Sequence, residues 1–185
     1  MSYIDIIKDK ARMDRKTIVL PETTDKRTLI AAAQIIQEGI ANIIMIGDAE
    51  KIMDGATWLE IDLTGVKIVN PLLCEKLEDY VQLLYETRKN KGMTVEKARE
   101  ILLSDPLTFG VIMVKANDAD GMVAGACHAT ADTLRPALQI RFLSDVCTGL
   151  RIWREWNLPV CRLWTESGSY RRRACCNCRF FCKKL

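Results

Sequence analysis

The chain has 185 residues, of which 28% are charged and 49% hydrophobic, a composition typical of a soluble globular protein. Its 27 basic and 24 acidic residues give a formal net charge of +3. No apolar run approaches the roughly 20 residues of a membrane span, and the charged N-terminal segment lacks the apolar core of a signal peptide. The composition therefore argues against a membrane protein, and we expect a cytoplasmic one.

Strand and helix patterns alternate from the start of the chain. The run TIVL at 17–20 stops at Pro21 and predicts a strand. Thr24 is expected to cap a helix whose apolar residues repeat at helical spacing from Leu29 to Ile40. The run NIIMIG at 42–47 predicts a second strand. This order predicts a parallel strand–helix–strand unit.

Further elements follow the same alternation. Residues 73–90 predict a long helix, and Thr94 is expected to cap another, VEKAREILLS, which ends at Asp105-Pro106. The runs 109–115 and 121–126 predict two more strands, the second one rich in small residues. We therefore expect an α/β fold with a mainly parallel sheet.

The last predicted helix carries the most informative arginine. Thr130 or Thr133 can cap this helix, and Pro136 is tolerable only in its first turn. Arg135 would then lie near a helix N-terminus, where free N–H groups, the helix dipole and a forked guanidinium favour phosphate or carboxylate. The alternative is a surface arginine paired with Asp132.

Three more candidate residues fit a purely structural role as well as a functional one, or better. Arg88 follows the pattern of basic residues at helix C-termini. His128 is the only histidine, and a lone histidine near a helix start is more often structural than a base. Neighbours in a strand point to opposite faces, so Cys127 does not automatically pair with it. The distant Cys74 and Cys127 make no metal site, and no dinucleotide or phosphate-loop motif occurs.

Four segments together resemble the phosphate acetyltransferase family. The resemblance extends from Lys8 to Ile140, and phosphate butyryltransferase is the nearest alternative; the blocks DADGMVAGA and HATADTLRP favour the acetyl enzyme. The four segments are TIVLPETTDKRTLIAAA (17–33), YETRKNKGMTVEKAREIL (85–102), DPLTFGVIMVKANDADGMVAGA (105–126) and HATADTLRPALQI (128–140).

The resemblance implies a fold and a reaction. The family has two α/β domains with a cleft between them, similar to the isocitrate and isopropylmalate dehydrogenase type. Residues 1–140 are thus expected to be a three-layer α/β/α first domain, incomplete at its end. The family transfers acetyl between acetyl-CoA and inorganic phosphate, giving acetyl phosphate and coenzyme A, without a permanently bound cofactor or metal. It is homodimeric, and neither a specific nucleic acid nor a membrane is an expected partner.

The resemblance also implies roles for four residues. Arg88 matches the arginine before K-x-K-G, placed at the coenzyme A phosphate or in the cleft. Arg135 matches the arginine of the TLRPALQ block, placed at the acyl-phosphate end, and is the expected catalytic residue because it would stabilise negative charge in the transition state. Thr130 and His128 are expected to bind substrate.

After Ile140 the composition changes abruptly. Residues 1–140 hold 17 basic and 21 acidic residues, but residues 141–185 hold 10 and 3, with six of the eight cysteines and three of the four tryptophans. The family continues instead with a K-T-A-P-G-type segment and a second domain that supplies a serine–arginine pair and an aspartate, usually cast as the base for the coenzyme thiol. We therefore expect 141–185 to be non-homologous.

A reading-frame shift accounts for this tail. Codons can be chosen for 141–184 that spell VPDCEYG and FADCGLNQ, family-like segments, one nucleotide out of register. Trp153, Trp156 and Trp164 have a single codon each and force three glycines, which fall where the family has glycine. The four cysteines between 175 and 182 fall on a run of family alanines. We expect a short deletion with a frameshift.

A selected binding role for the tail has weaker support. A zinc site needs four well-spaced ligands, whereas Cys175, Cys176 and Cys178 are crowded and no histidine is near. The basic residues allow non-specific nucleic-acid binding, and cytosolic disulfides are not expected. Three hypotheses follow: a truncated, inactive phosphate acetyltransferase; a non-enzymatic fragment that keeps weak coenzyme A or phosphate binding, or misfolds; and a basic, cysteine-rich binding tail on an α/β body.

The coding DNA around codon 140 tests the frameshift. We expect the bases downstream to encode the family's next segment in another frame, because the tryptophan codons already demand glycines there. A downstream sequence that encodes no such segment in any frame contradicts the frameshift.

Overall fold

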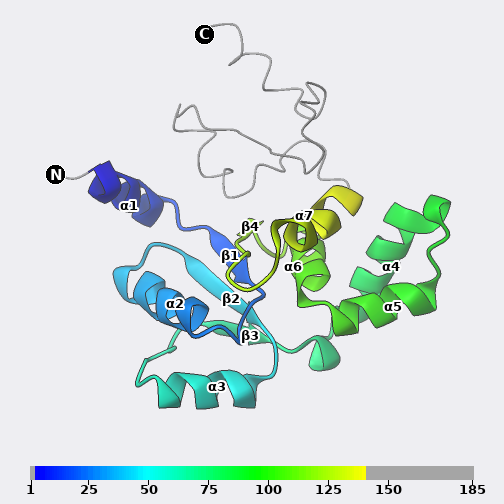
Figure 1. Ribbon diagram of the computed structural model, residues 1–185. Helices are drawn as coiled ribbons and strands as arrows, with labels where there is room; N and C mark the ends of the chain where they lie inside the picture. The colour runs from blue at the N-terminus through cyan, green and yellow to red at the C-terminus, as the bar shows by residue number, and fades with distance from the viewer. Residues whose placement is uncertain (1–2, 141–185) are drawn as a thin grey trace, which may run out of the picture.

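Four parallel strands form the sheet of the computed structural model, which describes residues 3–140 (Figure 1). They are β1 (Thr17–Leu20), β2 (Asn42–Ile46), β3 (Lys67–Val69) and β4 (Gly121–Met122), in the spatial order β3-β2-β1-β4. In register, β1 pairs with β2 from Thr17 opposite Asn42, and with β4 from Ile18 opposite Gly121. The predicted strands 17–20 and 42–47, and their parallel pairing, are confirmed.

Helices make the connections between these strands. The helices α2 (Lys26–Glu38) and α3 (Ala49–Trp58) link the first three strands. The long connection from β3 to β4 contains α4 (Leu77–Arg88), α5 (Val95–Ser104) and α6 (Pro106–Lys115), with the short 3₁₀ turns η1 (Pro71–Leu73) and η2 (Lys89–Lys91). The helix α1 (Tyr3–Met13) precedes β1, and α7 (Thr130–Gln139) follows β4.

The strands bury side chains on both faces, which makes three layers. Successive strand residues point to opposite faces, so Val19 and Ile44 join the core under α4, α5 and α6, whereas Leu20 and Ile43 join the core under α2 and α3. Figure 1 shows the two helix groups on either side of the sheet. The expected α/β/α arrangement is confirmed for residues 3–140.

Helix ends follow the chemistry of short polar side chains. The side chain of Thr94 accepts a hydrogen bond from the Lys97 N–H at the start of α5, as predicted. The cap of α2 is Asp25, which accepts from the Arg27 N–H at 2.8 Å, so the prediction of Thr24 was wrong by one residue.

The prediction of a strand at 109–115 was wrong, because these residues lie in α6. Seven consecutive residues from Leu107 to Met113 are buried, so the segment shows no helical period. The start signal was nevertheless present: Asp105 caps the helix by accepting from the Leu107 N–H at 3.0 Å, and Pro106 occupies its first position. The predicted strand 121–126 is confirmed only for its first two residues.

The start of α7 also differs from the prediction. Its N-cap is Ala129, and no side chain of the described residues caps it. Arg135 and Pro136 are therefore its sixth and seventh residues, so neither lies in the first turn. Pro136 is buried and has no N–H to offer the carbonyl of the preceding turn.

Within the described residues, no helix combines the length and the apolar character needed to cross a membrane. The expected boundary at residue 140 is untested, because residues 141–185, with the whole predicted tail, lie outside the described residues.

Gly110 lets α6 pack closely on the sheet. A Cβ atom there would lie 2.7 Å from the Met122 Sδ and 3.2 Å from both Ile46 and Val19. Gly110→Ala should therefore lower the free energy of unfolding, because overpacking costs about 1–3 kcal/mol and outweighs the gain of about 1 kcal/mol from the higher helix propensity of alanine. Urea unfolding measures it, with Gly121→Ala as control, since the nearest atom to a Cβ at Gly121 is 3.5 Å away. Equal losses in the two variants contradict the close contact.

Candidate functional site

The strand order places a ligand-binding position beside the ends of β1 and β4. The chain moves from β1 outward through β2 and β3, then returns to pair β4 with the other side of β1. In parallel α/β sheets, ligands bind outside the carboxyl ends of the strands where the strand order reverses in this way. The segments at this position are Pro21 to Thr23 after β1 and residues 123–129 after β4.

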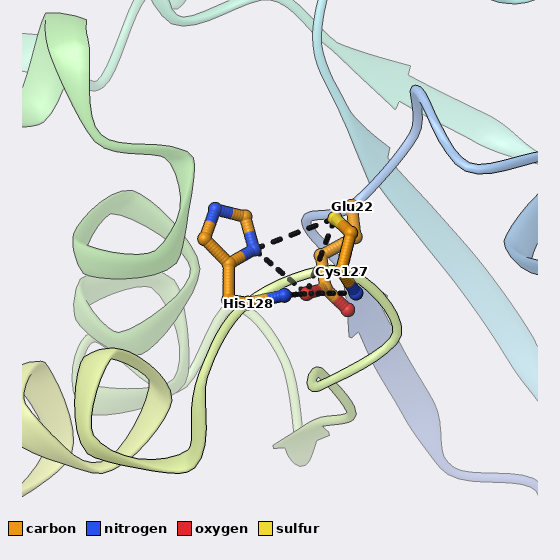
Figure 2. Close-up of side chains that lie close together, drawn as sticks. All are labelled: Glu22, Cys127 and His128. Carbon is orange, nitrogen blue, oxygen red and sulfur yellow. Dashed lines mark hydrogen bonds and ion pairs between the residues drawn. The ribbon is translucent and has the colours of Figure 1, made fainter.

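The buried carboxylate of Glu22 joins these two segments (Figure 2). Its Oε2 accepts the N–H groups of Gly125 and Ala126, both at 2.7 Å. Its Oε1 accepts the N–H groups of Cys127 at 3.2 Å and His128 at 3.1 Å. Four consecutive backbone N–H groups thus enclose one carboxylate, as in the anion-binding nests of other proteins.

Two further features stabilise this loop. Gly125 has a φ of 111°, a conformation that side-chain-bearing residues rarely adopt, and this turn aims the successive N–H groups at Glu22. Arg27, which is paired with the capping Asp25, donates from Nη2 to the carbonyl of Ala126. The loop is therefore attached both to the end of β1 and to the first turn of α2.

Glu22 is held as a carboxylate. Burial alone raises the pKa of a carboxyl group, but the hydrogen bonds from Ala126, His128, Cys127 and Gly125 outweigh it and lower the pKa of Glu22 to about 2. A buried charge would be costly without such partners.

The same carboxylate contacts two side chains of the loop. His128 Nδ1 lies 2.7 Å from Glu22 Oε1, and the Sγ atom of Cys127 lies 3.5 Å from that oxygen and 3.6 Å from His128 Nδ1. Burial and the charge of Glu22 raise the pKa of the Cys127 thiol, so this cysteine is not an activated nucleophile.

Glu22, Cys127 and His128 are close enough to one another to bind a metal ion. However, the N–H groups that surround Glu22 direct their positive ends at both oxygens and leave little capacity for a cation. The loop therefore binds the carboxylate of Glu22 itself as its anion, and this arrangement does not favour a metal ion.

A cavity of about 300 Å³ lies beside this loop. It brings together three of the four residues singled out in the sequence, Arg88, His128 and Arg135, from α4, the loop and α7. Thr130 is exposed at the start of α7 and is not part of the lining. The rest of the lining is formed by Leu84, Ile101, Asp105, Leu107, Thr108, Asp132, Pro136, Gln139 and Ile140.

Arg88 has a donor to spare in this cavity. It is the last residue of α4, and its Nη1 donates to the Gln139 side-chain oxygen at 2.7 Å. Its Nε is buried and has no hydrogen-bond partner within residues 3–140. An unpaired buried donor is unfavourable, and an anion in the cavity is one group that can satisfy it.

Arg135 forms a surface ion pair and also lines the cavity, so it has a feature of each of the two roles considered from the sequence. Its Nη2 lies 3.6 Å from Asp132 Oδ1, the surface pair that was the alternative to an anion site, yet it also lines the cavity. The side chain is 64% exposed, and such ion pairs contribute little stability. Arg135 can therefore exchange its contact with Asp132 for one with a bound anion at small cost.

The sequence analysis did not identify Glu22. Its position two residues beyond the end of β1 was a usable signal, because residues just after strand ends form the sites of parallel α/β folds. The signal needed the strand order, which depends on the pairing of β1 with β4 across about a hundred residues of chain.

The fold and the site define an α/β domain with an arginine-containing cavity beside the loop that follows β4. The sequence profile described as "Phosphate acetyl/butaryl transferase" matches residues 2–148. The chain belongs to this family, as the resemblance in its four segments had indicated.

Relatives support this assignment. The chain is 55% identical over 140 residues to the phosphate acetyltransferase of Acetivibrio thermocellus, covering 76% of this chain and 41% of that protein. With that of Thermoanaerobacterium thermosaccharolyticum it is 49% identical, covering 76% and 42%. The chain thus spans about two fifths of the length of these curated relatives.

Solved structures agree with the sequence comparison. The EutD phosphotransacetylase from Staphylococcus aureus matches with a TM-score of 0.67 and 41% identity, covering 74% of this chain and 41% of that one. A phosphotransacetylase from Streptococcus pyogenes matches with a TM-score of 0.72 and 37% identity, covering 78% and 44%.

The pKa of Glu22 predicts how stability depends on pH. Because folding lowers this pKa from about 4.5 to about 2, the ionised carboxylate stabilises the fold fully above pH 4.5, by about 3 kcal/mol, and this contribution is lost as the pH falls toward 2. Glu22→Gln should be less stable than the original chain at pH 6, with the gap narrowing toward pH 2. Urea unfolding at several pH values measures this, with the exposed Glu100→Gln as control. A gap independent of pH contradicts the shift.

Proposed function

We propose that this domain binds the anionic substrates of a phosphate acetyltransferase, in which acetyl passes between acetyl-CoA and inorganic phosphate. The observation that carries the proposal is that Arg88 and Arg135, which belong to different helices, line the same cavity. Family membership supplies the reaction, and relatives named phosphate acetyltransferase supply the acetyl preference over butyryl.

The cavity suits an oxyanion for physical reasons. Phosphate and the phosphates of coenzyme A are best held by guanidinium groups, whose forked donors match their oxygens. Arg88 offers a buried Nε donor, and Arg135 offers an exposed, weakly paired guanidinium. Asp105 and Asp132 in the lining balance the two arginines, so an anion is expected to bind by direct contact with the guanidinium groups rather than through a net positive charge.

The proposed reaction forms one bond and breaks one. A phosphate oxygen attacks the acetyl carbonyl carbon, the C–O bond of acetyl phosphate forms, and the C–S bond to coenzyme A breaks. Negative charge develops on the former carbonyl oxygen and on the leaving sulfur. We assign Arg135 to stabilising that charge, and Arg88 to holding a phosphate group.

Further family properties remain proposals for this chain. They are the homodimer, the cytoplasmic location, substrate binding by Thr130, and the absence of a permanently bound cofactor. The 185-residue polypeptide alone is expected to show little turnover, because it spans about two fifths of the relatives' length.

Titration of the full chain with coenzyme A and with inorganic phosphate tests the proposal. Arg88→Ala and Arg135→Ala should each weaken binding about tenfold or more, because each removes a charge-assisted hydrogen bond. Calorimetry measures the affinities, with circular dichroism to check the fold.

The matched control is Arg99→Ala. Arg99 is an exposed arginine on α5 that pairs with Glu78 at 2.6 Å and is not part of the cavity lining. We expect its affinity for both ligands to equal that of the original chain. Equal binding by the original chain and Arg135→Ala removes Arg135 from the site.

A further inference from the structure

The contact between Glu22 and His128 determines which ring nitrogen carries the proton. An ionised carboxylate only accepts hydrogen bonds, and Glu22 already accepts four backbone N–H groups. His128 Nδ1, at 2.7 Å from Glu22 Oε1, must therefore be the donor in this contact. In the neutral imidazole, Nε2 is then left with a free lone pair.

The second ring nitrogen of His128 points away from the buried carboxylate. Figure 2 shows it directed away from Glu22 and Cys127, and His128 is a lining residue of the cavity together with Arg88 and Arg135. The His128 side chain is 38% exposed, whereas that of Glu22 is 2% exposed. The imidazole thus lies between a buried carboxylate and the cavity that Arg88 and Arg135 line.

We propose that Glu22 is a positioning residue that holds His128 as the Nδ1–H tautomer, so that Nε2 accepts the O–H of a hydrogenphosphate bound beside Arg88 and Arg135. The inference rests on the proposed function and assigns a proton acceptor within the same site. Orientation of an imidazole by a buried carboxylate is a recurrent arrangement in catalytic sites.

The proton balance of this step is complete. As the phosphate oxygen attacks the acetyl carbon, the phosphate O–H bond breaks and an N–H bond forms at His128 Nε2. Glu22 stabilises the resulting imidazolium through the Nδ1–H contact. The C–S bond breaks, coenzyme A leaves as the thiolate, and the imidazolium later releases its proton to solvent.

The charges around His128 are consistent with this role. Glu22 is the nearest charge, and the Cys127 thiol lies 3.6 Å from Nδ1. The cavity lining adds two negative and two positive side chains. They are Asp105, Asp132, Arg88 and Arg135.

The full chain offers a direct test because it contains a single histidine. Long-range ¹H–¹⁵N NMR spectra of the chain, labelled with ¹⁵N in the histidine ring, report which ring nitrogen carries the proton. We expect the neutral imidazole to be Nδ1–H with Nε2 unprotonated, whereas a solvent-exposed histidine favours the opposite tautomer. If the neutral imidazole of His128 instead carries its proton mainly on Nε2, the inference is overturned.

Inorganic phosphate and sulfate separate the role of Nε2 from charge attraction alone. Both anions can bind the arginines, but only hydrogenphosphate has an O–H to donate to Nε2. We expect phosphate, and not sulfate, to shift the Nε2 resonance of the neutral imidazole. Coenzyme A, added without inorganic phosphate, is a third ligand to be tested. A shift of the Nε2 resonance with coenzyme A alone, or equal shifts with phosphate and sulfate, overturns the assignment.

Variants separate positioning from structure. In His128→Asn, the side-chain amide can still donate to Glu22 as Nδ1 does, but nothing replaces Nε2. We expect an unchanged thermal midpoint and loss of the preference for phosphate over sulfate. In Glu22→Gln, the ring nitrogen faces a neutral amide, and we expect the Nε2–H tautomer to increase.

These outcomes distinguish the inference from the proposed function. The Nε2–H tautomer in a chain that binds phosphate through Arg88 and Arg135 removes the role of Glu22 and leaves the proposed function standing. The Nδ1–H tautomer in a chain that binds neither phosphate nor coenzyme A counts against the proposed function. A His128→Asn chain that keeps the phosphate preference removes Nε2 from the site.

Discussion

The buried carboxylate of Glu22 is the interaction on which the site depends. It lies at the end of β1 and accepts four consecutive backbone N–H groups of the loop that follows β4. An unpaired buried charge is strongly unfavourable, and the loop supplies the partners of this carboxylate. The loop is therefore held to the sheet as long as Glu22 is ionised. The loop in turn determines where His128 lies and where α7 begins, and through α7 it places Arg135 beside the cavity.

The sheet provides the frame for this contact. The chain crosses from β3 back to β4 through α6, whose residues from Leu107 to Met113 are buried, and Gly110 allows this helix to approach β1 and β4. Because the helices before and after that crossing cover opposite faces, the ends of β1 and β4 diverge into different layers. Glu22 bridges the two segments that leave this point.

The two arginines of the cavity remain available to bind an anion, although carboxylates also line it. Glu22 is saturated with donors and does not compete for the arginines, whereas Arg88 retains an unpaired donor and Arg135 has only a long contact with Asp132. The family assignment and the cavity therefore agree: the chain belongs to the phosphate acetyl/butyryl transferase family, and two arginines line its cavity.

The sequence by itself determined the first strands, the α/β class and the family, because alternating buried runs, the Thr94 cap and the family segments are local signals. Through the family segments it also singled out Arg88, His128 and Arg135, which the structure places in the lining of one cavity. It did not determine α6, since a fully buried helix has no polar face and its apolar run resembles a buried strand. Nor did it identify Glu22 or the position of Arg135 within α7. Those were decided by tertiary structure, because the pairing of β1 with β4 brings a carboxylate and the N–H groups about a hundred residues later into hydrogen-bonding distance.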